Sequence, residues 1–272
     1  MKKYFALVVS ICFSVHLSAQ KAQALVAAEK AFEKSCLESG IRNGFLANVD
    51  SNGIDFTEKG PVDAKQFWRS LPSFDGIFSW SPSYSELSIS GDWGYTTGNY
   101  EHRSKKLQDA PDECGQYTTL WGKNDHGEWK YLIDIGNSHD CAPLDKNAKI
   151  ITLEKYGAGL LASQEKLSGK EKEFIVSFGQ NMKDAYLKYG SSKYILNMPQ
   201  HHPVTSRDSA VILISKTGAP LKYHPAGIKI SPGKDMAAAY GTFDVGNKTG
   251  SYLRIWRHEK TGWKIALEVI RP

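Results

Sequence analysis

Two acidic residues stand at the same place in two similar stretches of the chain. The stretch from Gly115 to Asp134 reads GQYTTLWGKNDHGEWKYLID, and the stretch from Gly250 to Glu268 reads GSYLRIWRHEKTGWKIALE. In both, a Trp-Lys pair follows a turn that contains glycine, and the acid comes five residues after that Trp. A carboxylate at the rim of a cavity can act as a general base or hold a polar group of a ligand. Asp134 is therefore a candidate catalytic residue.

A structural role is the alternative for this acid. Side chains on a strand alternate between its two faces, and apolar residues at every second position predict one continuous core face. Asp134 would then lie on the opposite face and pair across strands with a cation. The apolar set is Trp129, Tyr131, Ile133 and Ile135, and the candidate cations are Lys130, Lys264 and Arg254.

A second candidate base follows the first helical segment. Asp50 lies in NVDSNGIDF, with Asp55 as a further candidate in the same stretch. The aligned stretch of the second copy, KYGSSKYIL, contains no acid, so the first copy is the better candidate for catalysis. Alternatively, Asp50 is a turn or cap residue beside Asn52-Gly53.

Polar and aromatic side chains on the neighbouring strands are candidate ligand contacts. Tyr100 is replaced by Phe243 in the second copy, so its hydroxyl is not needed by the shared architecture. A place in the core is the alternative for the repeated aromatic residues, and a solvated loop is the alternative for His139. The candidate ligand-binding residues are Tyr100, His102, Tyr117, Trp121 and His139.

The repeat extends to whole domains. The segment FSWSPSYSELSISGDWGYTTGNY (78–100) aligns without a gap on LKYHPAGIKISPGKDMAAAYGTF (221–243). Each copy is predicted to begin with a helix, over 22–49 with a break at Gly40 and over about 168–189 with Ser168 as N-cap. A short strand, a short helix and a run of strands follow. The predicted strands are 82–90, 93–102, 115–123 and 128–135, and then 225–231, 236–244, 250–258 and 262–270.

Three segments of the first copy carry a family resemblance. AEKAFEKSCLESGIRNGFLANV, ELSISGDWGYTTGNYEHR and GQYTTLWGKNDHGEWKYLIDIGNSH resemble the SnoaL-like branch of the nuclear transport factor 2-like superfamily, in particular its exported proteins of unknown function. The resemblance implies an α+β fold of two tandem cone-shaped domains, each with N-terminal helices packed on a strongly curved, mainly antiparallel sheet around a cavity. It also implies pairing through sheet faces, as an internal pseudo-dimer or a homodimer. In the isomerases and cyclases of this superfamily, an Asp in the cavity abstracts a proton beside a carbonyl.

The N-terminal segment predicts export. MKK followed by YFALVVSICFSVHL and LSAQ has the pattern of a bacterial signal peptide cleaved after Ala19, which indicates a periplasmic or secreted protein. The later sequence has no stretch that approaches a membrane span. The expected organisation is a signal peptide (1–19), a first domain (20–137), a linker (138–167) and a second domain (168–272).

Three cysteines remain after cleavage. Cys114 and Cys141 flank the hairpin of the first copy and are the preferred disulfide pair, with Cys36 free. Three unpaired thiols are the alternative. No Cys-x-x-Cys or Cys/His ligand spacing predicts a metal site, and no phosphate-binding or dinucleotide motif predicts a cofactor. The net charge of +5 comes from scattered basic residues, which does not favour a nucleic-acid partner.

Three functions remain open. The leading hypothesis is an exported binding protein that holds a small apolar or carbonyl-containing molecule in the first cone. A second is a cofactor-independent isomerase, cyclase or lyase that uses a carboxylate base. A third is a protein-interaction scaffold without ligand, which a cavity filled by Trp80, Trp93 and Phe45 would favour.

Overall fold

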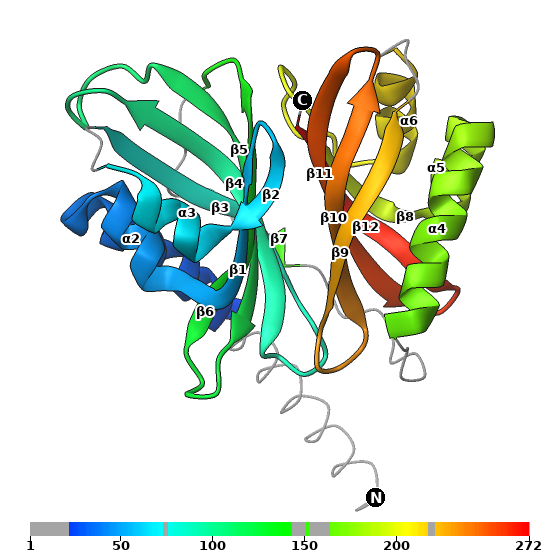
Figure 1. Ribbon diagram of the computed structural model, residues 1–272, viewed down its shortest axis with the longest axis horizontal. Helices are drawn as coiled ribbons and strands as arrows, with labels where there is room; N and C mark the ends of the chain where they lie inside the picture. Colours follow the sequence, from blue (N-terminus) through cyan, green and yellow to red (C-terminus); the bar gives the residue numbers. More distant parts are fainter. Residues whose placement is uncertain (1–21, 73–75, 143–150, 153–163, 217–220, 272) are drawn as a thin grey trace, which may run out of the picture.

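Two α+β units make up the described part of the chain. The computed structural model describes residues 22–72, 76–142, 151–152, 164–216 and 221–271. In each unit helices come first and a mainly antiparallel sheet follows, as predicted (Figure 1). The predicted signal peptide (1–19) and most of the predicted linker (138–167) lie outside the described residues.

The first unit begins with two helices that meet at Gly40. Gly40 has φ of 83°, a left-handed conformation that glycine adopts without strain, and the break predicted there is confirmed. The sheet has the order β2-β1-β6-β5-β4-β3-β7. Its elements are a helix over residues 22–39, α2 (Ile41–Asn48), β1 (Val49–Thr57), β2 (Gly60–Asp63), α3 (Ala64–Ser70), β3 (Ile77–Leu87), β4 (Trp93–Arg103), β5 (Glu113–Lys123), β6 (Trp129–His139) and β7 (Ile151–Thr152).

The second unit repeats this plan. Its sheet has the order β8-β12-β11-β10-β9. The helix predicted over 168–189 is two helices, because Asn181 leaves the helical conformation and its side chain accepts a hydrogen bond from the backbone N–H of Asp184. Ser168 lies inside the first of them and is not its N-cap. The elements are α4 (Gln164–Gln180), α5 (Met182–Tyr189), β8 (Gly190–Asn197), α6 (Arg207–Ser215), β9 (Lys222–Ile230), β10 (Met236–Val245), β11 (Lys248–Glu259) and β12 (Gly262–Arg271).

A β-bulge on β6 changes the face on which each side chain lies. Leu120 pairs with Ile133, whereas the next residue, Trp121, pairs with Tyr131, so Leu132 is an extra residue. The predicted continuous core face on this strand is therefore wrong. Before the bulge, Tyr131 packs in the helix-facing core, and after it, Ile133 packs against the second unit.

The same bulge occurs in the second unit, where Ala266 is the extra residue of β12. Ile265 faces the helices, and Leu267 faces the first unit. The bulge thus brings Asp134 and Glu268 onto the inner, helix-facing side of their sheets. The sequence alternation alone places them on the outer side.

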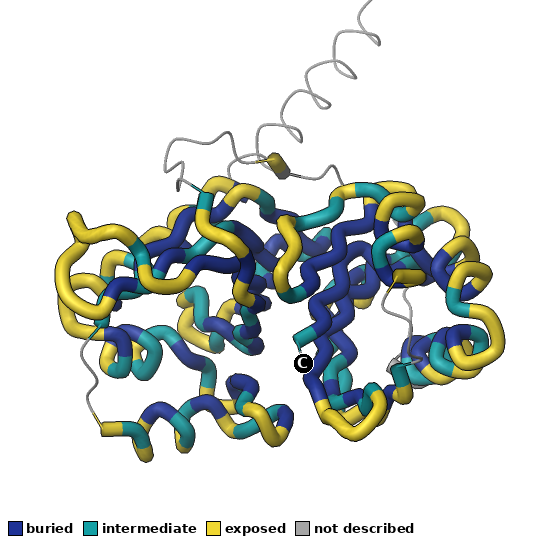
Figure 2. Tube along the Cα trace, turned by 90° about the horizontal axis from the view of Figure 1, so that it is seen from above, coloured by how far each residue is buried: buried dark blue, intermediate teal, exposed yellow. Residues whose placement is uncertain are grey.

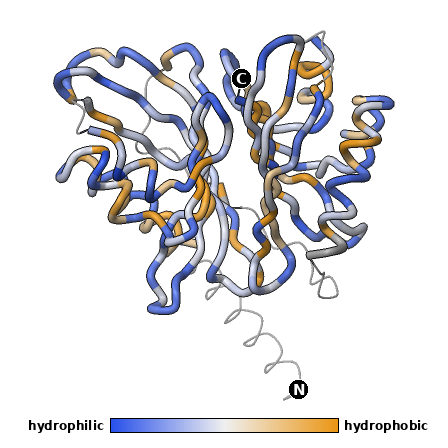
Figure 3. Tube along the Cα trace, viewed as in Figure 1, coloured by the Kyte–Doolittle hydropathy of each residue, from blue (hydrophilic) through white to orange (hydrophobic). Residues whose placement is uncertain are grey.

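Three clusters of buried apolar residues stabilise the molecule. One lies between helices and sheet in each unit, and the third joins the two sheets face to face. Figure 1 shows the helices on the outer sides and the sheets in the middle, and Figure 2 shows buried residues gathered where the sheets meet. Apolar residues line these strands (Figure 3). The third cluster includes Trp93, Tyr95, Leu120, Ile133, Leu253, Ile255, Leu267 and Val269.

Polar contacts also cross between the units. Glu86 of β3 and Arg257 of β11 form a buried ion pair at 2.7 Å. The side-chain amide of Asn197 donates to the hydroxyls of Thr97 (3.2 Å) and Thr118 (3.1 Å). Because a buried polar group is costly unless it is hydrogen-bonded, these contacts fix one relative position of the two sheets. Within the described ranges, no helix is both long and apolar enough to cross a membrane.

Candidate functional site

A cavity of about 300 Å³ lies between the helices and the sheet of the first unit, and Arg271 of the second unit contributes to its wall. Most of its wall is aromatic, and the polar groups in the wall are few. Trp80 and Phe45 belong to the wall and do not fill the space, while Trp93 lies between the two sheets. The lining residues include Phe32, Phe45, Phe67, Trp68, Phe78, Trp80, Tyr100, Tyr117, Asp55, Glu113, Thr119, Asp134 and Arg271.

Asp134 lies in the cavity wall on β6, immediately after the bulge. The hydroxyl of Thr119, its cross-strand neighbour, donates to Asp134 Oδ2 at 2.6 Å. Burial raises the pKa of Asp134 from 3.8 to about 6, although the hydrogen bond from Thr119 opposes this shift. The expected pairing with Lys130 does not form, since the Lys130 ammonium donates to the carbonyl of Ala47. No described cation lies within ion-pair distance of Asp134. At neutral pH its carboxylate therefore carries an unpaired charge.

Asp55, on β1, is a second carboxyl in the cavity wall. Its Oδ2 accepts hydrogen bonds from the indole N–H of Trp68 and from the hydroxyl of Tyr131 (3.3 Å). Its Oδ1 is buried and has no hydrogen-bond partner among the described residues. Burial, and then the negative charge of Asp134, raise the pKa of Asp55 well above its ordinary value. Both effects favour the protonated form of the Asp55 carboxyl.

Glu29 is a third acid inside the first cone, and the sequence analysis missed it. It accepts hydrogen bonds from the indoles of Trp80 (2.6 Å) and Trp121 (2.8 Å) and from the hydroxyl of Thr96. Burial raises the pKa of Glu29 to about 7. The sequence contains a signal for this burial. Glu29 lies three residues before Phe32, so the helical spacing places it on the apolar face of the first helix.

The second cone holds an arginine in the corresponding place. Arg254 pairs with Glu268 on β12 as Thr119 pairs with Asp134 on β6. The fully buried Arg254 guanidinium forms ion pairs with Glu268, at 2.6 Å, and with Glu171. The sequence analysis offered an ion pair with Arg254 as a structural role for the repeated acid. That role applies to Glu268, in the second copy, and not to Asp134.

The other site candidates are distributed over several places. Tyr117 and Tyr100 line the cavity, and the Tyr100 hydroxyl donates to Glu113 at 2.8 Å. Trp121 is fully buried behind the cavity wall, where it binds Glu29. His102 packs on Phe78 with 4.9 Å between ring centroids and is not a lining residue.

Asp50 is held in a local turn. Its Oδ1 accepts a hydrogen bond from the backbone N–H of Asn52 at 2.9 Å, as the turn interpretation of NVDSNGIDF expects. Asp50 is absent from the cavity wall, where the acid of this stretch is Asp55.

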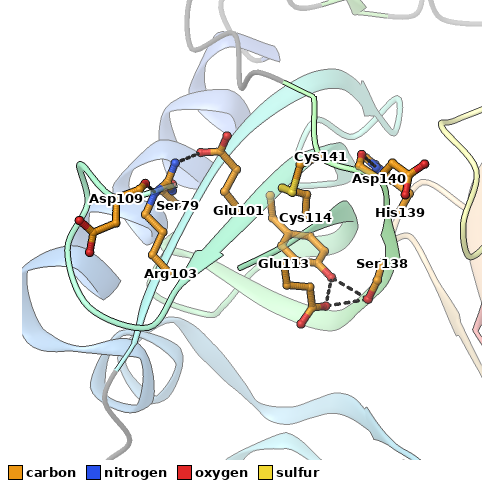
Figure 4. Close-up of a disulfide and its surroundings, with 11 residues drawn as sticks. Ser79, Glu101, Arg103, Asp109, Glu113, Cys114, Ser138, His139, Asp140 and Cys141 are labelled. Carbon is orange, nitrogen blue, oxygen red and sulfur yellow. Dashed lines mark hydrogen bonds and ion pairs between the residues drawn. A yellow bond between two sulfur atoms is a disulfide. The ribbon is translucent and has the colours of Figure 1, made fainter. Parts of the chain in front are cut away.

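His139 lies beside a disulfide at the outer end of β6. Cys114 and Cys141 are bonded (Figure 4), which confirms the preferred pairing. Cys36 is free and buried. His139 Nδ1 lies 2.8 Å from the carbonyl oxygen of Asp140, and its ring packs on His202. His139 is therefore outside the cone cavity. Across the described segments, no group of three or more His, Cys, Asp and Glu side chains is arranged to hold a metal ion.

Comparisons with known proteins find likeness in three-dimensional structure. An NTF2-like protein from Cytophaga hutchinsonii is 16% identical, with a match over 40% of this chain and 98% of that one and a TM-score of 0.34. An NTF-2 like protein of unknown function from Shewanella oneidensis is 16% identical, over 39% of this chain and 96% of that one, with a TM-score of 0.34. The likeness concerns the fold alone.

A third structure is a domain of unknown function with a cystatin-like fold from Nostoc punctiforme. It is 8% identical, with a match over 42% of this chain and 78% of that one and a TM-score of 0.35. No protein-family model and no curated protein matches the sequence.

Proposed function

We propose that this protein binds a small, partly apolar molecule in the cavity of its first cone, and that the second cone has a structural role. The observation that carries the proposal is the aromatic-walled cavity of about 300 Å³ with the Asp134 carboxylate in its wall. Ligand sites are typically mostly apolar cavities of about 300 to 1,000 Å³ with a few polar groups in defined positions. The volume of this cavity is at the lower end of that range.

The proposal separates the two cones for a physical reason. In the second cone, Arg254, Glu171 and Glu268 satisfy one another in the buried centre. In the first cone, the smaller Thr119 leaves space and leaves Asp134 without a cation. A scaffold without ligand is less favoured, because it was expected to have its cavity filled by aromatic side chains. Export, for which the N-terminal segment is the sole support, remains part of the proposal.

Blocking the cavity tests this function. Native mass spectrometry of the protein purified from its own host would detect a co-purified molecule, and thermal shift screening of apolar amines, amides and ketones would detect others. Thr119→Arg places a large side chain in the cavity, whereas Thr249→Arg makes the same change at an exposed position. We expect Thr119→Arg to abolish binding and Thr249→Arg to retain it. Binding that survives Thr119→Arg would place the site elsewhere.

Proton transfer is a second candidate function, and the raised pKa of Asp134 favours it. A carboxylate with a pKa of about 6 in an apolar cavity is a stronger base than an ordinary aspartate and is still ionised at neutral pH. If Asp134 is a base, the protein accelerates exchange of α-hydrogens of cyclic ketones in deuterated water, which NMR detects. Exchange should stop in Asp134→Asn. Equal exchange in wild type and variant would exclude Asp134 as the base.

A further inference from the structure

The two cones differ in charge at one central position, while aromatic rings and two acids surround that position in both. Thr119 and Arg254 occupy equivalent places on β5 and β11, each opposite the repeated acid of the next strand. In the second cone the side chain at this position brings a positive charge into the centre. In the first cone the shorter side chain of Thr119 ends at the wall of the cavity and does not reach the centre.

The guanidinium of Arg254 is enclosed by rings and carboxylates. Its central carbon lies 4.2 Å from the ring centroid of Phe174, 4.7 Å from that of Tyr223 and 4.9 Å from that of Tyr252. Glu171 and Glu268 accept its hydrogen bonds. Cations are attracted to aromatic faces within about 6 Å, and charge-assisted hydrogen bonds to carboxylates are among the strongest in proteins.

The first cone retains a counterpart of every member of this enclosure. The sequence repeat and the strand pairing relate Phe174, Tyr223, Tyr252, Glu171 and Glu268 to Phe32, Trp80, Tyr117, Glu29 and Asp134, respectively. Four of these five counterparts line the cavity, and Glu29 lies behind it, bonded to Trp80. The first cone has the enclosure of a guanidinium without the guanidinium.

The charges in the first cone are consistent with a missing cation. The Asp134 carboxylate has no described cation within ion-pair distance, and the buried Oδ1 of Asp55 has no hydrogen-bond partner in the described part of the chain. Arg271 is the described cation of the cavity wall, and its positive charge opposes the rise in the pKa of Asp134 and of Asp55. Its guanidinium forms no ion pair with either acid and donates to the carbonyl of Phe56 at 3.0 Å. The cavity wall thus has three described carboxyl groups, of Asp55, Glu113 and Asp134, and one described cation, Arg271.

From this correspondence we infer that the cavity of the first cone binds an organic cation, a guanidinium or protonated amine with a small apolar body. The cationic group lies against Phe32, Trp80 and Tyr117 and donates hydrogen bonds to Asp134. Arg254 occupies the equivalent place in the second cone, as an internal substitute for the ligand. This inference rests on the proposed function and adds the chemical class of the ligand.

A pair of probes that differ in charge and share a shape tests the inference. Benzamidine is a planar cation at about pH 7.5, whereas benzamide is its neutral isostere. We expect benzamidine to bind the wild-type protein at least about tenfold more tightly than benzamide, as measured by isothermal titration calorimetry. Asp134→Asn should remove this preference. Asp125→Asn is the control, because it removes an equal charge at an exposed turn.

The outcomes distinguish a failure of the inference about charge from a failure of the proposed binding function. Benzamide binding as tightly as benzamidine would overturn the inference about charge and leave the proposed binding function intact. No binding of either probe, together with no small molecule in native mass spectrometry, would overturn both. A preference for benzamidine that persists in Asp134→Asn would also contradict the inference. If Asp134→Asn does not fold, Thr119→Arg, which supplies the guanidinium within the chain, should abolish benzamidine binding.

Discussion

At the scale of single residues, the first cone contains buried acids that form no ion pair with a described cation. Asp134 and Asp55 line the cavity, and Glu29 lies behind it. Burial raises the pKa of each of the three, which means that the folded protein holds their protons more tightly than the unfolded chain does. Such groups reduce stability wherever they are ionised, and binding sites commonly retain them.

Asp134→Asn is predicted to increase stability at alkaline pH. The unfolded chain ionises this acid near its ordinary pKa of 3.8 and the folded chain near 6, so its unfavourable contribution grows across that interval and is constant above it. We expect the variant to be more stable than wild type by about 1 to 3 kcal/mol at about pH 8, and by less than about 1 kcal/mol at about pH 4. Urea denaturation at both pH values measures the difference. A difference that does not change with pH would contradict the prediction.

Thr119→Arg is predicted to stabilise the folded protein in the absence of ligand. The new guanidinium can pair with Asp134 and stack on Phe32, Trp80 and Tyr117, the first-cone counterparts of the rings that enclose Arg254. Hydrogen bonds to charged groups contribute about 1.5 to 3 kcal/mol, and we expect a net gain of about 1 to 2 kcal/mol at pH 8. Thr119→Met, which has similar bulk and no charge, is the control. If Met stabilises as much as Arg, the gain comes from filling the cavity.

At the scale of elements, the order of helices and strands could be predicted and the faces of the strands could not. The Gly40 break and the hairpin strands follow from glycine positions and apolar alternation. The bulges at Leu132 and Ala266 leave no signal in that alternation, because one extra residue exchanges the faces of all residues after it. The alternation consequently placed Asp134 on the outer side in the structural alternative, whereas the structure has it in the cavity wall. Asp55 was recognised as an acid, but its place in the cavity depends on the pairing of β1 with β6.

The disulfide between β5 and the end of β6 is predicted to contribute to stability. Cys114 and Cys141 are 27 residues apart. A cross-link that closes a loop of that length lowers the entropy of the unfolded chain and so raises the free energy of unfolding by about 3 to 4 kcal/mol. We expect Cys141→Ser, compared with the wild-type protein in oxidising buffer, to lose free energy of unfolding of this size. Treating the wild type with a reductant should produce the same loss. Little change in either experiment would show that the bond does not constrain the unfolded ensemble.

At the scale of the whole molecule, two sheets share one apolar interface with an ion pair inside it. Arg257→Met leaves Glu86 buried without its cation, and breaking one partner of a buried pair costs about 3 to 5 kcal/mol. The double variant Glu86→Gln, Arg257→Met should recover a large part of this loss. Equal losses in single and double variants would show that the pair is not coupled.

An exposed ion pair provides the comparison for this experiment. Lys170 and Glu173 lie 2.6 Å apart, but their side chains are 41% and 49% exposed. Solvent screens such pairs, which contribute about 0 to 1 kcal/mol. We expect Lys170→Met to change the free energy of unfolding by less than that amount. Comparing Lys170→Met with Arg257→Met separates the general effect of losing a positive charge from the specific effect of losing it inside the interface between the sheets.

The covalent connection between the cones has a consequence for behaviour in dilute solution. Two separate cones meeting through these faces would dissociate on dilution, whereas cones of a single chain keep a high local concentration of each other. The melting temperature should therefore be the same at nanomolar and micromolar protein. The unequal centres also fix the stoichiometry, since Arg254 closes one of the two equivalent sites. A titration should end at one ligand per chain, with a hyperbolic curve and no cooperativity.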